Sequence, residues 1–376
     1  MKLRLASVIR CPVCRGPLAL HVFRGDTQTL DATSRRELEE RAIEPASVEQ
    51  LVRDGVLECT DCRAWYPIVE RVPVLLDFAT PVHAEFAKRH RAELDGLDAE
   101  PPQGAPRPGE MLTQRSFSSE WRTVRDDELT FTYTHTERED FIRIELEGVP
   151  EQQDRPALDV GCGYGTEAVL LQRVTGREIF GTDLNLSLLD SGEQVDRLPL
   201  VHTMVASLFA LPFEQRSFDL VYSHGVLHHT FSTERAFAAV SELATAGGRI
   251  AMWVYSNRDF ASGLRLRFSA AAERALRPTI SRAPGPLQAA AVHALSVPHF
   301  VRYRRLGPNR ERWHYRNSVH SMRDRWTPRY AHRHDTDEVE RWFDRAGFEH
   351  EPVDAVAYER RFGYPLIGIG KRGVRR

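Results

Sequence analysis

The segment Asp159-Val160-Gly161-Cys162-Gly163-Tyr164-Gly165 constrains the fold of this chain most strongly. It follows an apolar stretch, residues 157–160, that is typical of a buried strand, and it precedes a stretch with helical periodicity, residues 166–174. Glycines at alternate positions let backbone amides approach a ligand where side chains would block it. The pattern predicts a strand, a tight turn and a helix arranged as a cofactor-binding loop.

The βα alternation continues beyond this loop, which predicts an α/β fold with a Rossmann-like, doubly wound sheet. Further strands are predicted at 178–182, 200–205, 218–223 and 248–255, with a helix at 232–244 before the last of them. A helix at 336–346 and two strands, 349–356 and 366–370, are predicted to close the domain. The roughly 80 residues that separate them from residue 255 are too many for an ordinary connection, so a helical lid insertion is expected.

Composition divides the 376 residues into domains. Residues 100–109, rich in proline and glycine, suit neither a helix nor a strand. We therefore predict a small domain at 1–78, a linker at 79–110 and the α/β domain at 111–376, with the lid at 256–335.

An acidic residue stands twenty positions beyond Gly163, at the end of the second predicted strand. The carboxylate of this residue, Asp183, can accept both hydrogen bonds of a ribose diol. That arrangement suits NAD and S-adenosylmethionine alike. The dinucleotide fingerprint, however, needs its third small residue one position later, where this chain has Thr166.

Three further motifs accompany the loop: Leu-Pro-Phe-x-x-x-Ser-Phe-Asp-Leu-Val at 211–221, Ser-His-Gly-Val-Leu-His-His at 223–229 and Gly-Gly-Arg-Ile at 247–250. With them, residues 156–255 resemble the class I S-adenosylmethionine-dependent methyltransferases of the small-molecule type. The resemblance implies that the glycines border the methionine and ribose of the cofactor, and that Asp183 holds the ribose. Ser207 stands where such enzymes often carry an acid for the adenine. The implied cofactor contacts are Asp159, Gly161, Cys162, Gly163, Gly165, Asp183, Leu184, Ser207, Leu208 and Ser223.

Four of the five cysteines form two Cys-x-x-Cys pairs, Cys11 with Cys14 and Cys59 with Cys62. Two such knuckles can hold one structural Zn²⁺ with no open position for water. The 44 residues between the pairs leave room for a helical insertion at 34–54. Residues 8–78 resemble the small zinc-ribbon family whose best-known member activates methyltransferases of the translation machinery. Unmetallated cysteines that pair or pack are the alternative.

Candidate catalytic residues follow the fourth and fifth predicted strands of the α/β domain, at the sheet edge where ligands of such folds bind. They are His224, His228, His229 and Tyr255. Methyl transfer from a sulfonium requires a general base only when the acceptor atom carries a proton at neutral pH. A structural or cofactor-lining role for these side chains is the alternative.

The predicted lid is strongly basic. Residues 256–334 contain sixteen arginines, no lysine and four acids, so their local charge is +12, whereas the whole chain carries −2. Arginine suits bidentate recognition of carboxylate or phosphate, and aromatic residues are interleaved with it. A solvated, charge-balancing helix face is the alternative. The expected substrate contacts are Arg316, Arg323, Arg325, Arg329, Tyr330 and His332.

These features predict a methyltransferase that uses S-adenosylmethionine and a structural Zn²⁺ and acts on a small anionic metabolite, natural-product or glycan intermediate. The second hypothesis is a base methyltransferase of ribosomal or transfer RNA, because a four-cysteine unit before a Rossmann-like domain is also the plan of bacterial ribosomal-RNA guanine methyltransferases. A third is a non-catalytic adaptor that binds S-adenosylmethionine, or a protein partner through the zinc domain. The start of the sequence lacks a signal-peptide pattern and no window is apolar enough to span a membrane, so we expect a cytoplasmic protein without a membrane partner.

Overall fold

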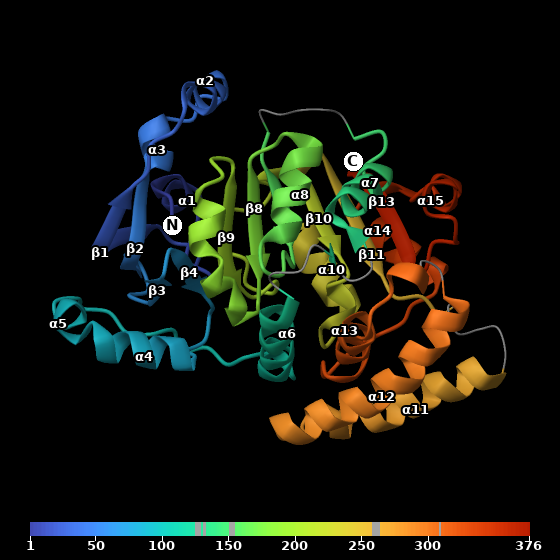
Figure 1. Cartoon of the computed structure of the whole chain (residues 1–376). Coiled ribbons are helices and arrows are strands. Elements are labelled where there is room, and N and C mark those ends of the chain that lie inside the picture. Colours follow the sequence, from blue (N-terminus) through green and yellow to red (C-terminus); the bar gives the residue numbers. More distant parts are fainter. Residues whose placement is uncertain (125–128, 131–132, 150–154, 258–263, 308–309) are drawn as a thin grey trace. The chain divides into compact units, whose positions relative to one another are not determined.

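The computed structural model describes residues 1–124, 129–130, 133–149, 155–257, 264–307 and 310–376 (Figure 1). The chain divides into two compact units, which are described separately. The first comprises Met1–Pro106, Pro150–Tyr222 and Ala239–Arg249. The second comprises Arg107–Val149, Ser223–Ala238 and Ile250–Arg376.

The first unit is built on one continuous sheet in which the order is β1-β2-β3-β4-β9-β8-β7-β10. Strands β1 to β4 form an antiparallel meander, and from β4 onward neighbouring strands are parallel. The strands are β1 (Leu18–Thr27), β2 (Gln50–Cys59), β3 (Trp65–Val69), β4 (Val72–Leu75), β7 (Ala157–Val160), β8 (Ile179–Asp183), β9 (Val201–Ala206) and β10 (Phe218–His224). The fold class is therefore the predicted one, a Rossmann-like α/β sheet preceded by a small cysteine-bearing domain.

The parallel strands are short apolar segments whose residues are almost all buried, as expected where both faces of a sheet are covered. Strand β7 coincides with the prediction at 157–160. The predicted helix at 166–174 is α8 (Thr166–Thr175), which ends at the left-handed Gly176. Behind β8 the chain forms a 3₁₀ turn, η1 (Leu186–Asp190), and the short helix α9 (Gly192–Asp196).

The amino-terminal domain joins the sheet through β4. Val74 lies opposite Val205 and Leu75 opposite Ala206 in parallel register. The sequence predicted a separate small domain, and the structure instead extends the parallel sheet of the α/β core with one strand of that domain. The helices of the domain are α1 (Leu3–Val8), α2 (Ala32–Glu40) and α3 (Pro45–Glu49), so the predicted insertion is helical up to residue 49 and β2 begins at Gln50.

The stretch predicted as a linker carries two helices, α4 (Pro81–Arg89) and α5 (Arg91–Leu94). Helix α4 begins with a capping box between Thr80 and His83 and with Pro81 in its first turn, which are strong local start signals. Phe86 is fully buried in a cluster with Val56 and Trp65 of the meander. The apolar residues of α4 therefore belong to the core of the amino-terminal domain.

In the second unit, strands β11 (Ala244–Val254), β13 (Ile369–Arg375) and β12 (Phe348–Pro352) are neighbours in that order. Strands β12 and β13 are antiparallel, with Phe348 opposite Arg375. A two-stranded ribbon, β5 (Leu129–Thr130) and β6 (Tyr133–Thr134), lies apart from them. The described helices of this unit are α6 (Glu110–Val124), α7 (His135–Glu145), η2 (Leu227–His229), α10 (Thr233–Ser241), α11 (Leu264–Ile280), α12 (Gly285–Leu306), η4 (Arg310–Arg312), α13 (Tyr315–Trp326), α14 (Thr336–Arg345) and α15 (Ala355–Phe362).

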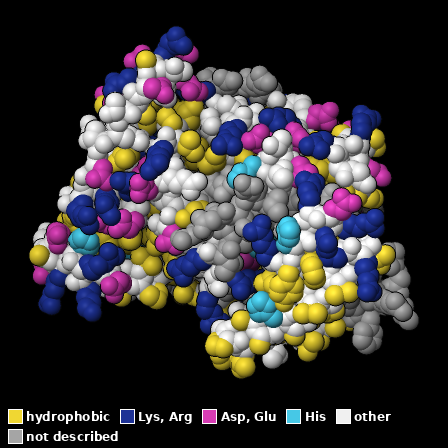
Figure 2. Space-filling view, viewed as in Figure 1, with side chains coloured by type: hydrophobic (Ala, Val, Ile, Leu, Met, Phe, Trp, Pro, Cys, Tyr) yellow, Lys and Arg dark blue, Asp and Glu magenta, His cyan; other side chains and the backbone are white. Residues whose placement is uncertain are grey.

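The stretch predicted as a lid forms helices α11, α12, η4 and α13. Figure 2 shows apolar side chains gathered on the surface that α11 and α12 form. Leu287, Val297, Val301 and Leu306 of α12 are exposed there. Among the described residues, no helix has the length and apolar composition needed to cross a membrane.

Candidate functional site

The glycine loop adopts backbone conformations that favour glycine at three alternate positions. The φ angles of Gly161, Gly163 and Gly165 are 95°, 62° and 92°, in the left-handed region that L side chains rarely adopt. A Cβ added at Gly165 would lie 3.2 Å from the side chain of Val195. The loop therefore turns tightly from β7 into α8 and leaves backbone groups uncovered by side chains, as a cofactor cradle requires.

Asp183 is held directly against this loop. Its carboxylate accepts hydrogen bonds from the amides of Gly163 and Asn185, each at 2.8 Å. These two bonds occupy different carboxylate oxygens, and each oxygen keeps capacity for a further donor such as a ribose hydroxyl. Burial raises the pKa of Asp183, although the two amides act in the opposite direction.

Asn185 is a site residue that the sequence analysis missed. Its side-chain amide donates to the carbonyl of Gly163 at 2.9 Å, and its side chain is fully buried. It thus fixes the same loop position that Asp183 contacts. The available signal was its place two residues after the acid, where a side-chain amide can reach back to the glycine turn.

The other predicted cofactor residues fall into three groups. Asp159 and Cys162 are buried beneath the loop, and burial raises the pKa of the Cys162 thiol well above its usual value. Ser207 is buried after β9, where its hydroxyl accepts from the amide of Phe209 at 3.3 Å, and Leu208 is half-buried beside it. Leu184 is half-buried after β8. All of these residues lie in the first unit, whereas Ser223 belongs to the second.

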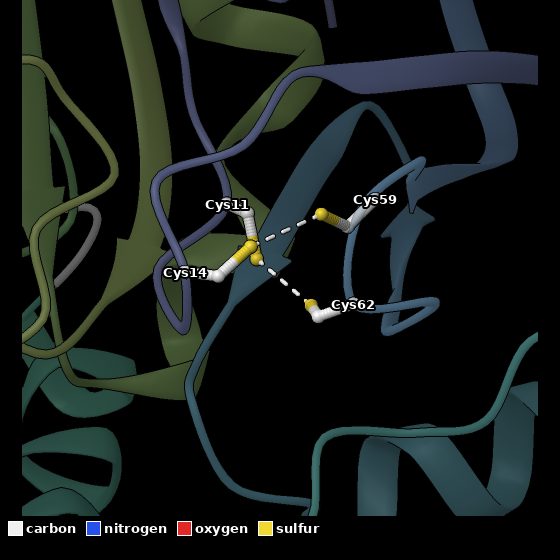
Figure 3. Close-up of side chains that lie close together, drawn as sticks. All are labelled: Cys11, Cys14, Cys59 and Cys62. Atoms are coloured by element: carbon white, nitrogen blue, oxygen red, sulfur yellow. Dashed lines mark hydrogen bonds between the residues drawn. The ribbon is translucent and has the colours of Figure 1, made fainter.

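The four paired cysteines converge, as Figure 3 shows. Their sulfur atoms all lie within 4.8 Å of one another, with Cys11 to Cys62 at 3.6 Å and Cys14 to Cys59 at 3.4 Å. A tetrahedral Zn²⁺ site with bonds of about 2.3 Å places its sulfurs roughly 3.8 Å apart. The donor set and its spacing therefore fit one structural Zn²⁺. The amide of Gly16 donates to the sulfur of Cys14 at 3.4 Å, which suits a thiolate ligand.

The predicted catalytic histidines differ in their surroundings within the second unit. The Nδ1 atom of His224 lies 2.7 Å from the carboxylate of Glu145. His229 faces the carbonyl of Tyr330 at 2.9 Å through Nδ1 and Asp324 at 3.3 Å through Nε2. These two contacts hold the ring between the segment after α13 and α13 itself.

His228 is fully buried, and neither of its ring nitrogens has a hydrogen-bond partner among the residues that the structure describes. Its ring lies 4.0 Å from that of Tyr255 and 4.2 Å from that of His229, between centroids. Burial, and then the nearby charge of His229, lowers the pKa of His228 well below 6.5. It is therefore a neutral imidazole with an unused acceptor nitrogen.

Tyr255 donates a hydrogen bond to Asp324, and burial raises its pKa well above 10, so it remains a phenol. Asp324 thus joins Tyr255 and His229 in one buried network. From the sequence, this acid contributed only to the charge count of residues 256–334. The sequence feature that could have identified it is the small number of acidic residues in this basic stretch, because each carboxylate there has several arginines as possible partners.

The predicted substrate residues do not form a single cluster. Arg325 is engaged with Glu273 at 2.5 Å, and Arg277 and Arg333 contact the same carboxylate. Arg316 is exposed on α13, and Arg323 reaches the carbonyl of Ser119 at 3.4 Å. In the segment after α13, the guanidinium of Arg329 lies 5.6 Å from the ring of Tyr330, which stacks on His332 at 5.5 Å.

Comparison with known proteins identifies two domains. Residues 158–252 match the family described as a methyltransferase domain, and residues 2–70 match the Trm112p-like proteins. The chain therefore carries a methyltransferase domain preceded by a Trm112p-like domain, as the two resemblances predicted.

Individual relatives are more distant. A mouse protein named arginine-hydroxylase NDUFAF5, mitochondrial, is 32% identical over 32% of this chain and 34% of its own length. A Bos taurus protein named as a tRNA methyltransferase 9B is 29% identical over 29% of this chain and 25% of its own length. The chain thus spans about a third or less of these curated relatives. A solved complex of the Haloferax volcanii Trm112 methyltransferase activator with a methyltransferase has a TM-score of 0.41 at 14% identity, covering 69% of this chain and 96% of that one.

Proposed function

We propose that this chain is an S-adenosylmethionine-dependent methyltransferase. One observation carries the proposal: Asp183 is hydrogen-bonded to the amide of Gly163 at the tip of a left-handed glycine loop. The contact places a carboxylate that can bind the hydroxyl groups of a ribose beside a glycine loop whose backbone is not covered by side chains. The third glycine of the loop is Gly165, whereas a dinucleotide-binding loop has its third small residue one position later. This difference favours S-adenosylmethionine over NAD.

The residues proposed to hold the cofactor are the glycine loop, Asp183 with Leu184, and the Ser207-Leu208 segment. Asp159 and Cys162 brace the loop from below, since both are buried. Ser207 uses its hydroxyl for the amide of Phe209, so the backbone of Leu208 is the better candidate for the adenine. The bound cofactor supplies a sulfonium-activated methyl group.

His228 is the proposed general base, because its neutral ring has a free acceptor nitrogen. It follows β10, whose neighbour in the sheet is β7, the strand that leads into the glycine loop. The carboxyl ends of parallel strands meet at one sheet edge, which is where such folds bind ligands. An acceptor hydroxyl would transfer its proton to a His228 nitrogen. His229, Asp324 and Tyr255 would position this ring. His224 is not proposed as the base, because its Nδ1 atom contacts Glu145.

The proposed substrate is a small anionic molecule. The residues that support it are Arg316, Arg323 and Arg329 with Tyr330 and His332, because α13 and the segment after it concentrate guanidinium groups beside aromatic rings. Arg325 has less capacity for a ligand, since it pairs with Glu273. A planar guanidinium binds carboxylate or phosphate in two parallel hydrogen bonds.

Calorimetric titration tests the cofactor assignment. We expect S-adenosylhomocysteine to bind and NAD not to bind. The substitution Asp183→Ala should weaken the binding of S-adenosylhomocysteine by at least about tenfold. It removes a charged acceptor, and hydrogen bonds to charged groups are stronger than those between neutral groups. Asp190→Ala, in the η1 turn, is the matched control and should bind normally. Binding of NAD in place of S-adenosylhomocysteine would refute the proposal.

An RNA base methyltransferase is the second candidate. The Trm112p-like match and the relative named as a tRNA methyltransferase favour it. In that case the arginines would hold phosphates and the aromatic rings would stack bases. Gel shifts with transfer and ribosomal RNA at physiological salt separate the two: a small-molecule enzyme should show no specific complex, and a specific complex would replace the small-molecule assignment.

A further inference from the structure

The residue after the second cysteine of each knuckle is an arginine in a left-handed conformation. The φ angles of Arg15 and Arg63 are 66° and 61°. Glycine is favoured at such positions, because it lacks the Cβ that makes this region unfavourable for other residues. An arginine kept at this place in the chain points to a use for its side chain.

The two arginines have different partners. Arg63 pairs with Glu58 at 2.7 Å and donates to the carbonyl of Asp98 at 2.6 Å, so both of its partners precede the methyltransferase domain. Arg15 instead crosses to the methyltransferase domain. One of its guanidinium nitrogens, Nη1, donates to the carbonyl of Leu211 and to that of Phe213 at 2.7 Å.

The first knuckle forms a third hydrogen bond with the segment at residues 211–213. The amide of Arg10, directly before Cys11, donates to the carbonyl of Pro212 at 2.8 Å, and the Arg10 guanidinium pairs with Glu214 at 2.7 Å. Three consecutive carbonyls, those of residues 211 to 213, are therefore bound by the two residues that flank the Cys11–Cys14 turn.

The gripped segment continues directly from the proposed adenine contacts. After Ser207 the chain turns back, with the amide of Ala210 donating to the carbonyl of Ser207 at 2.9 Å. Phe213 then anchors the other end, fully buried and 4.9 Å from the ring of Phe218. The position of residues 207 and 208 thus depends on a short segment that the first knuckle fixes from outside.

We infer that metal binding at the four cysteines and cofactor binding at the glycine-loop site are energetically coupled, with Arg15 as the positioning residue between them. This inference rests on the proposed function, since it assumes that the cofactor binds beside Ser207 and Leu208. Four sulfur ligands on one ion fix the Cys11–Cys14 turn and hence the backbone from which Arg15 reaches Leu211 and Phe213. Without the metal the turn is free to open, and the segment after β9 loses its clamp. Such coupling is reciprocal, so the cofactor must also tighten metal binding.

Titration of S-adenosylhomocysteine into the zinc-loaded full chain and two glycine variants tests the coupling. Glycine suits the left-handed backbone at this position, so in Arg15→Gly the zinc content measured by mass spectrometry should stay at about one per chain. The variant loses the hydrogen bonds to Leu211 and Phe213, so its affinity for S-adenosylhomocysteine should fall roughly five- to tenfold. Arg63→Gly makes the same change in the second knuckle and should bind like the wild type. Equal affinities of Arg15→Gly and the wild type would overturn the coupling, and so would an equal loss in both variants. A wild-type chain that binds no S-adenosylhomocysteine would overturn the proposed function as well.

A second measurement needs no variant. Zinc transfer from the wild-type chain to a coloured chelator is followed with and without saturating S-adenosylhomocysteine. The apparent zinc affinity should rise by the same factor by which zinc removal weakens S-adenosylhomocysteine. An unchanged zinc affinity would overturn the coupling even if Arg15→Gly failed to fold.

Discussion

At the scale of single residues, hydrogen-bond partners distinguish His228 from His224 and His229. Each of those two has a carboxylate neighbour, Glu145 or Asp324, whereas both nitrogens of the buried His228 lack a partner among the described residues. A buried imidazole without partners costs stability, and that cost is typical of groups kept for function. The motif Val-Leu-His-His gave no means of ranking the two histidines, because their roles depend on Tyr330 and Asp324, about a hundred residues away.

Titration of this ring is a testable consequence. The pKa of His228 is lowered well below 6.5 by burial and by His229. Nuclear magnetic resonance of histidine-labelled protein should therefore show the ring of His228 among those that stay neutral as the pH falls through 6.5. Its signal should be absent from His228→Gln. A His228 resonance that titrates near 6.5 would contradict the buried, neutral assignment.

A second residue-scale prediction concerns Glu178, which is buried at the start of β8. Its carboxylate pairs with Arg4 at 2.9 Å and with His202 at 3.0 Å. Burial alone would raise the pKa of Glu178, but hydrogen bonds from His202 and Arg4 outweigh it and lower the pKa to about 2. Because the pKa is lower in the folded than in the unfolded chain, the contribution to stability is fully present above about pH 4.5 and is lost as the pH falls toward 2.

This contribution should amount to about 3 kcal/mol in the free energy of unfolding at neutral pH. Urea denaturation of the wild type between pH 6 and 3 should show the loss, and Glu178→Gln should flatten it. The matched change Glu193→Gln, at an exposed pair with Arg197, should leave the pH dependence unchanged. An equally steep decline in Glu178→Gln would show that other groups cause it.

At the scale of elements, the cysteine knuckles organise the ends of β1 and β2. Leu18, just after the first knuckle, lies opposite Cys59 in the β1–β2 ladder. We therefore expect about one Zn²⁺ per chain, lost when Cys59 and Cys62 are changed to serine. Since metal binding contributes directly to the folding of such small domains, the melting temperature should fall by several degrees.

Chelation of the wild type should reproduce that effect, and Cys162→Ser should retain the metal because Cys162 lies in the glycine loop. A metal-free chain with an unchanged melting temperature would refute the structural role of zinc. The cysteine spacing predicted this site correctly because ligand chemistry depends on only four residues.

Local patterns predicted some elements and missed others for a physical reason. The strand at 157–160 and the helix after Gly165 follow from apolar runs and glycine conformations within a few residues. The contacts of Arg4 with Glu178 and of Arg325 with Glu273 join residues 174 and 52 positions apart, and no periodicity marks them. The prediction of a linker was wrong at α4. The prolines and glycines at 100–109 were read as a sign that all of residues 79–110 lack regular structure, whereas Pro81 lies in the first turn of a helix.

At the scale of the whole molecule, the Trm112p-like domain is part of the first compact unit together with the methyltransferase core. Lys2 is almost completely buried, donates to the carbonyl of Val201 at 2.7 Å and pairs with Asp196 at 3.4 Å. Together with the β4–β9 ladder, such contacts make this domain a structural part of the sheet. Its removal would expose the edge of β9, take Lys2 away from the carboxylate of Asp196, and leave Glu178 with His202 but without Arg4.

A chain that begins at residue 107 should therefore fail to fold on its own, because exposed strand edges and unpaired buried charges both destabilise it. Expression followed by size-exclusion chromatography and circular dichroism measures this outcome. Addition of residues 1–106 as a separate polypeptide should restore a soluble complex. A monomeric, folded fragment without that addition would contradict the structural role of the domain.

The register of β4 against β9 also has a consequence for synthesis on the ribosome. Leu75 pairs with Ala206, so 131 residues must be added after β4 before its partner exists. At about 5–20 residues per second, that takes roughly 7–26 s. During this interval the apolar β4 has an unpaired edge, of the kind that joins other nascent chains. Early protection by a chaperone, and slow codons placed after residue 206 rather than before it, should therefore improve the yield of native protein.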